Sequence, residues 1–128
     1  MERTRLFLAA NALLWIDYRL YCLARPGFLA EAAGVAATTA TGSTELRAMY
    51  GGLQTAIGAL ALIAVLRRTM VRTALIALAF LAGGLFSGRI VGVVMDGGLS
   101  AYTAAALVLE STLTTLSVAL LRQRSGGA

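Results

Sequence analysis

The stretch that decides the fold is residues 46–66, which read LRAMYGGLQTAIGALALIAVL. It is rich in Ala, Leu, Ile and Val, and its length matches the ~20 mostly apolar residues that an α-helix needs to cross a bilayer core. Three more segments of suitable length and character are residues 6–24, 70–95 and 99–121. The sequence therefore predicts an all-α integral membrane four-helix bundle, built as one membrane domain over residues 1–128.

Composition excludes the common soluble classes. Hydrophobic residues make up 59% of the chain and charged residues only 13%, whereas a soluble domain carries about a quarter charged residues. So much apolar sequence also argues against disorder. With one cysteine and no histidine, the chain lacks the ligands of zinc, haem and iron–sulfur sites. We expect no metal and no cofactor.

The placement of arginine predicts the topology. The net charge of +5 comes from eleven basic residues, all arginine, against six acids. If the chain crosses four times, seven arginines fall on the side of both termini, which the positive-inside rule makes the cytoplasmic side of the membrane. They are Arg3, Arg5, Arg67, Arg68, Arg72, Arg122 and Arg124. Because topology explains the basic balance, we expect no nucleic-acid partner.

The N-terminus has a competing interpretation as a cleaved signal peptide. Residues 1–5 resemble a basic n-region and residues 6–16 an apolar h-region. Asp17 and Arg19 interrupt the pattern where small residues should mark a cleavage site. A retained first span is therefore favoured.

The longest connection runs from residue 25 to residue 44. Pro26 can occupy the first turn of a short helix, which predicts an extra helix on the outer side of the membrane. Ser43 or Thr44 is the expected N-cap of the second span. Whether this connection is a lid or only a connector stays open.

Charged residues within or beside the spans point to a site. Each costs ~2.5–3.5 kcal/mol to insert near the centre of a span, so such residues usually have a partner or a role. By helical rise Glu110 lies about 16 Å inward, and all seven fall in the outer half or the middle of the membrane. One shared polar pocket opening outward is therefore predicted. The seven are Asp17, Arg19, Glu45, Arg47, Arg89, Asp96 and Glu110.

Helical phase selects the candidate site residues. Residues three, four or seven apart share a face, as do Arg47, Tyr50 and Gln54 in the second span. The predicted ligand-binding residues are Arg89, Arg47, Glu45, Tyr50, Gln54, Asn11 and Tyr18. The predicted catalytic carboxylates are Glu110, Asp96 and Asp17.

Charge counting predicts where a proton sits. Four acids of this set face three arginines, and Glu110 is the deepest acid with no arginine on its own helix. Since desolvation favours the neutral form of a carboxyl group, Glu110 is predicted to hold a proton. Arg89 and Arg47 are then expected to pair with Asp96, Glu45 or Asp17. Alternatively, the acids and arginines nearest the ends of the spans are interfacial residues that reach for water.

Small residues predict close helix packing. Gly84, Gly88 and Gly92 repeat at four-residue spacing, and Gly51 and Gly58 mark a second groove. In lipid, such grooves let helix backbones approach each other. Packing is favoured here over contact with a substrate.

The order of features resembles a known family. Asn11, Pro26, the run Glu45-Leu-Arg-Ala-Met-Tyr-Gly-Gly52, Gly88-Arg89, Asp96-Gly97 and Glu110 are similar to small bacterial four-span proteins that are classed only as a domain of unknown function, with a looser similarity to DoxX-like membrane proteins. Ala12 departs from the glycine expected after the asparagine. The resemblance implies a fold and candidate positions but no reaction.

Three functions compete at this point. The first is a pocket for an apolar small molecule such as an isoprenoid, quinone or lipid, with acid–base isomerisation or cyclisation at Glu110 as an enzymatic version. The second is a non-catalytic subunit of a membrane redox or lipid-handling complex, which the DoxX-like similarity suggests. The third is proton-coupled transport by a homo-oligomer. Whether the protein is an enzyme stays open.

Overall fold

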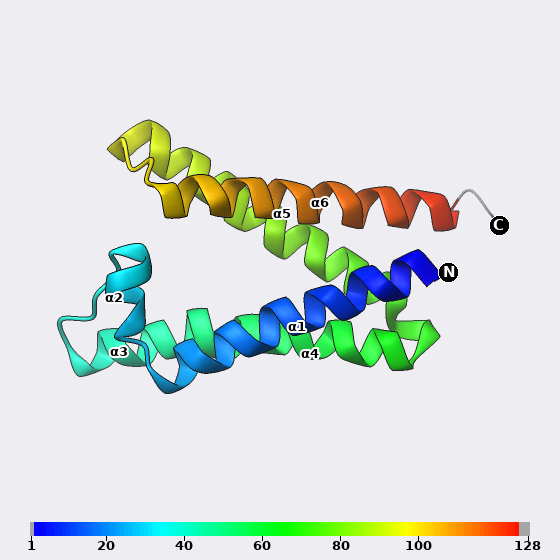
Figure 1. Cartoon of the computed structure of the whole chain (residues 1–128), viewed down its shortest axis with the longest axis horizontal. Helices are drawn as coiled ribbons and strands as arrows, with labels where there is room; N and C mark the ends of the chain where they lie inside the picture. Colours follow the sequence, from blue (N-terminus) through cyan, green and yellow to red (C-terminus); the bar gives the residue numbers. More distant parts are fainter. Residues whose placement is uncertain (1, 126–128) are drawn as a thin grey trace. The chain divides into compact units, whose positions relative to one another are not determined.

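A computed structural model describes residues 2–125, which form helices joined by short connections and contain no strand (Figure 1). Four helices in this part are long and apolar enough to cross a membrane. They are Glu2–Ala24, Ala40–Leu66, Arg68–Asp96 and Ala101–Arg124. The prediction of an all-α chain with four apolar spans is confirmed.

The chain divides into two compact units. The first unit, Met1–Val71, contains α1 (Glu2–Ala24), α2 (Phe28–Ala33), α3 (Ala40–Leu46), the π-helix η1 (Arg47–Leu53), α4 (Gln54–Leu66) and the 3₁₀-helix η2 (Arg68–Met70). The second unit, Arg72–Ala128, contains α5 (Val71–Asp96), whose first residue falls at the boundary, and α6 (Ala101–Ser125). The single membrane domain over residues 1–128 stays a prediction.

In the first unit α1 and α4 lie side by side, and glycine sets their spacing (Figure 1). A Cβ atom placed on Gly58 would lie 2.8 Å from Cγ1 of Ile16, and one on Gly51 would lie 2.6 Å from Cβ of Leu23. Neither position has room for a side chain, which is how small residues bring membrane helices together. The packing predicted for Gly51 and Gly58 is confirmed.

In the second unit a different glycine makes the contact. A Cβ atom on Gly83 would lie 3.5 Å from Cγ2 of Thr114, which places this part of α5 against α6. Among the described residues, nothing lies within 4 Å of a Cβ atom placed on Gly84, Gly88 or Gly92. Those three share another face of α5, so the contact predicted for them is not seen in the described part of the chain.

The second span begins earlier than predicted. Thr39 is the N-cap of α3, and its hydroxyl oxygen accepts a hydrogen bond from the Gly42 amide at 3.0 Å. The prediction of Ser43 or Thr44 as N-cap is wrong, because the Ser43 amide already donates to the Thr39 carbonyl inside the first helical turn. The predicted short helix is confirmed as α2, which ends at Gly34 with φ 69°, a conformation that favours glycine.

Candidate functional site

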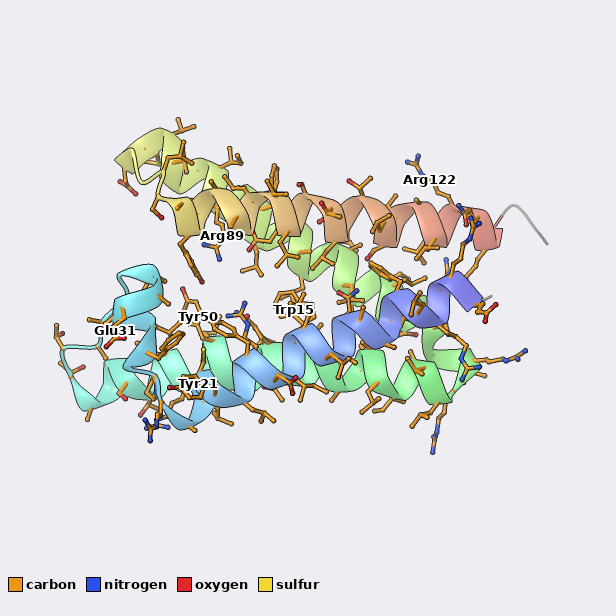
Figure 2. All side chains as sticks on the ribbon, in the orientation of Figure 1. Trp15, Tyr21, Glu31, Tyr50, Arg89 and Arg122 are labelled. Atoms are coloured by element: carbon orange, nitrogen blue, oxygen red, sulfur yellow. The ribbon has the colours of Figure 1, made fainter. Side chains whose placement is uncertain are left out.

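An ion pair joins the two helices of the second unit. Nε of Arg89 on α5 donates to both carboxylate oxygens of Glu110 on α6, at 2.9 and 3.1 Å. Figure 2 shows the Arg89 side chain beside the first turns of α6. The Glu110 side chain is 5% exposed and the Arg89 side chain 23%. This acid is therefore almost fully enclosed by protein, and its charge is matched by an arginine.

The pair lies well inside the two spans. Arg89 comes seven residues before the end of α5 and Glu110 nine residues after the start of α6, which places them about 10 and 14 Å from those ends. The guanidinium carbon of Arg89 also lies 5.7 Å from the ring centroid of Tyr102, a cation–π distance. Since Tyr102 and Glu110 both belong to α6, this helix holds the arginine at two points.

The partner predicted for Arg89 is wrong. Arg89 and Asp96 share a face of α5, but seven residues separate them by about 10 Å along the helix, and Asp96 is exposed. Glu110 comes within reach because α6 runs back along α5. An adjacent guanidinium neutralises a carboxylate by charge-assisted hydrogen bonds. The proton predicted on Glu110 stays a prediction.

The partner predicted for Arg47 is also wrong. Its guanidinium donates to the backbone carbonyls of Leu23 and Ala24, the latter at 3.2 Å. The last carbonyls of a helix have no partner within the helix and carry a partial negative charge. Arg47 therefore caps the C-terminus of α1, and no carboxylate pairs with it in the part of the chain that the structure describes.

The run from Arg47 to Gly52 thereby has a structural explanation. It forms most of the π-helix η1, in which Arg47 caps α1 and Gly51 contacts Leu23. A π-helix closes i→i+5 bonds and changes the helical phase. The single face predicted for Arg47, Tyr50 and Gln54 is accordingly divided, because Arg47 is exposed, Tyr50 half-buried and Gln54 buried.

Asn11 and Tyr18 have partners close by in the first unit. Asn11 donates to the Phe7 carbonyl at 2.8 Å and accepts from the Trp15 indole at 3.3 Å. The Tyr18 ring meets Phe28 edge-on, with centroids 6.0 Å apart. These contacts hold α1 and its surroundings in place, and the ligand-binding roles of Asn11 and Tyr18 stay predictions.

Two predicted acids of the first unit lie apart from any such contact. Asp17 and Glu45 are exposed, and neither forms an ion pair with a residue that the structure describes. Their roles as catalytic and ligand-binding residues stay predictions, as does that of Asp96 in the second unit.

A small hollow accompanies the ion pair. It has a volume of about 240 Å³ and is lined by Gly83, Phe86, Ser87, Ser111, Thr114 and Thr115 of α5 and α6. Neither Arg89 nor Glu110 lines this hollow, but its lining residue Thr114 lies one helical turn after Glu110 and donates to the backbone carbonyl of that residue at 2.8 Å. Ser87, Ser111 and Thr115 are not among the predicted site residues, although hydroxyl groups three and four residues apart in an apolar span are a signal that the sequence contains.

A second hollow lies in the connection of the first unit. Its volume is about 350 Å³, and its lining includes Pro26, Ala30, Thr38, Thr39 and Ser43. The lining consists mostly of small side chains and contains no charged residue. It offers neither an acid–base group nor an ion pair, so the candidate site is the pair formed by Arg89 and Glu110.

Comparison with known proteins gives a family and nothing more specific. The model of a domain of unknown function, DUF4345, matches residues 3–121. No curated protein and no solved structure gives a significant match. The chain therefore belongs to the DUF4345 family. This confirms the resemblance to a family of unknown function, while the similarity to DoxX-like proteins stays a prediction.

Proposed function

We propose that this DUF4345 protein is a multi-pass protein of the bacterial inner membrane that binds an apolar small molecule by its polar end. The ligand is an isoprenoid, a quinone or a lipid, and the site is the pair formed by Arg89 and Glu110 with the adjoining hollow. The observation that carries the proposal is this ion pair itself, which lies within two spans that are otherwise apolar.

Stability alone is a weak reason for such a pair. Replacing a buried ion pair by apolar residues is often neutral, or stabilising by ~1–4 kcal/mol, because the desolvation of two charges offsets their attraction. Ionisable residues inside a membrane span are accordingly a default indication of function. A guanidinium beside a carboxylate offers both donors and acceptors to the polar end of a ligand.

The hollow favours a ligand that donates a hydrogen bond. Ser87, Ser111 and Thr114 already donate their hydroxyl protons to backbone carbonyls, at 2.8, 3.0 and 2.8 Å. Their oxygens can then act only as acceptors towards a ligand. The volume of about 240 Å³ is below the ~300 Å³ at which pockets for drug-sized ligands begin. It suits the polar end and the first carbons of a longer apolar molecule.

Binding is better supported than catalysis. An isomerase or cyclase of the kind considered above requires a neutral acid that gives up a proton. Both oxygens of Glu110 accept from the Arg89 guanidinium, which suits a fixed carboxylate. The role that we propose for Glu110 is therefore to orient Arg89 and the ligand.

The test is to identify what the protein carries out of the membrane. Wild-type protein is purified in mild detergent and extracted, and the extract is examined by mass spectrometry. Glu110→Gln and Arg89→Gln are treated in parallel, with Arg72→Gln as the matched control because Arg72 is exposed in the first turn of α5. Loss of a charged hydrogen bond, worth ~1.5–3 kcal/mol, should weaken the affinity for the ligand about tenfold or more.

The outcomes separate clearly. We expect wild-type protein and Arg72→Gln to retain one class of apolar molecule, and the two site variants to lose it. If a site variant does not fold, the double variant Arg89→Leu with Glu110→Leu takes its place, since it leaves no charge without a partner. Equal amounts of the same molecule in wild-type protein and in the double variant would contradict the proposal.

A further inference from the structure

Hydroxyl groups gather around the hollow between α5 and α6. Four of its six lining residues carry one, namely Ser87, Ser111, Thr114 and Thr115. Ser87 lies nine residues before the end of α5 and Ser111 ten residues after the start of α6, about 14 and 15 Å from those ends. The hollow is therefore a polar spot deep within two apolar spans, where a hydrogen-bonding group without a partner costs free energy.

Most of these hydroxyl groups can only accept a hydrogen bond from a bound molecule. Ser87, Ser111 and Thr114 each donate to a backbone carbonyl of their own helix, at 2.8, 3.0 and 2.8 Å, and a hydroxyl group has a single proton. The Thr115 hydroxyl forms no hydrogen bond with a described residue, so it can donate as well as accept. The hollow thus offers three acceptors and one group that can donate.

The charge balance around the hollow favours an uncharged ligand. No charged side chain lines it. Glu110, one turn before Thr114, already forms an ion pair with Arg89 at 2.9 Å, so a cation in the hollow would lack a counter-ion. An anion would meet mostly acceptor oxygens. Since a charge is costly at this depth of a membrane, a phospholipid headgroup does not suit the hollow.

We infer that the group bound in this hollow is the hydroxyl of an otherwise apolar molecule, that is, of an isoprenoid alcohol or a hydroquinone. A hydroxyl donates to the oxygen of Ser87 or Ser111 and accepts from Thr115. A carbonyl oxygen, as in an oxidised quinone, and an ether oxygen can only accept, so they can use Thr115 alone. The inference rests on the function proposed above and names the ligand class and the residues that select it.

The chain supplies a matched control for these hydroxyl groups. Ser111 and Thr112 both donate to the Val108 carbonyl, at 3.0 and 2.7 Å, but only Ser111 lines the hollow. Ser111→Ala and Thr112→Ala therefore each remove a hydrogen bond to the same carbonyl, and only Ser111→Ala also removes an acceptor from the hollow. A change in binding that is confined to Ser111→Ala is thus separated from an effect on α6 itself.

The test measures the affinity of the whole chain in detergent for four compounds by native mass spectrometry. Farnesol is compared with its methyl ether, which lacks the donor, and decylubiquinol with decylubiquinone, its oxidised form, in the absence of air. We expect a hydroxyl compound to bind about threefold to tenfold more tightly than its partner, as for one neutral hydrogen bond. The double variant Ser87→Ala with Ser111→Ala should lose this preference, and Thr112→Ala should keep it.

The two pairs of compounds distinguish the two sources of the hydroxyl group. A preference within the farnesol pair alone would support an isoprenoid alcohol, and one within the ubiquinol pair alone a hydroquinone. This comparison needs only wild-type protein, so it holds even if a variant does not fold. Equal affinity within both pairs, or a preference that the double variant leaves unchanged, would overturn the inference.

Failure of this inference is distinguishable from failure of the proposed function. Affinity that is equal within both pairs but is lost in Glu110→Gln would overturn the inference and leave the proposed function standing. Binding of none of the four compounds would overturn the inference too, and the extraction from the membrane described above would still decide the proposed function.

Discussion

The second unit matches its buried acid Glu110 with an arginine from the neighbouring helix, at 2.9 Å. Among the described residues of the first unit, by contrast, no arginine forms an ion pair with a carboxylate. Arg47 donates to backbone carbonyls at the end of α1, and Arg19 lies against the rings of Trp15 and Tyr18. A substitution in the ion pair removes one charge and leaves the other without its partner, whereas a substitution of the capping arginine leaves only backbone carbonyls. The two arrangements should therefore respond differently to mutation.

This difference shows why the functional proposals fall where they do. A helix end and an aromatic ring are permanent partners that a chain can supply anywhere. They explain Arg47 without a ligand, but they do not neutralise Arg19. A buried ion pair costs desolvation free energy, and apolar residues can often replace it without loss of stability. Charge therefore exceeds what the fold requires at the pair formed by Arg89 and Glu110.

The largest effect is expected from breaking the ion pair on one side. Glu110→Leu leaves the Arg89 charge without its carboxylate and should lower the free energy of unfolding by about 3–5 kcal/mol. Adding Arg89→Leu should restore most of that loss. Unfolding in mixed detergent micelles measures both, with Asp96→Asn as the control. A double variant as unstable as Glu110→Leu would show that the two residues do not act as a pair.

A smaller effect is expected at the contact between α1 and η1. Gly51→Ala places a Cβ atom 2.7 Å from the Leu23 Cα atom, and such overpacking costs about 1–3 kcal/mol. At Gly52 the nearest atom would lie 3.8 Å away, so Gly52→Ala should be neutral or slightly stabilising. Thermal unfolding of the two variants checks the difference. Equal melting temperatures would contradict the close approach of α1 and η1.

The smallest effect is expected at the helix cap. Arg47→Gln removes hydrogen bonds to the last carbonyls of α1 and should cost about 1 kcal/mol, since the side chain is exposed and its contribution is reduced by solvent. Arg25→Gln is the matched control, because Arg25 is exposed and makes no side-chain contact of this kind among the described residues. Hydrogen exchange should show the last turn of α1 opening more often in Arg47→Gln alone. Identical hydrogen exchange in both variants would contradict the role of Arg47 as the cap of α1.

Much of the fold could be predicted because the length and apolar composition of a segment identify a membrane helix. The segment that opens at Leu46 needed only its apolar content to be recognised. Gly51 and Gly58 could be recognised as packing positions because a small residue at seven-residue spacing has few other uses in lipid. These are local properties of a single helix, and sequence periodicity reports them directly.

The partners of the charged residues could not be predicted in the same way. Counting acids and arginines helix by helix left Glu110 without a partner and assigned Arg89 and Arg47 to Asp96, Glu45 or Asp17. The contact between Arg89 and Glu110 depends on the register in which α6 packs along α5. No local sequence pattern encodes that register. Backbone carbonyls are absent from any count of charges, so the cap made by Arg47 was also missed. The π-helix then changed the phase on which Tyr50 and Gln54 had been aligned.

The most direct test of the central claim exchanges the two charges. Arg89→Glu and Glu110→Arg are each made alone and then together, and the amount of folded protein in the membrane and its unfolding are measured. Either single exchange sets two like charges side by side, so we expect it to prevent stable folding. The double exchange should restore a folded protein. A double exchange no more stable than the worse of the two single exchanges would contradict the central claim.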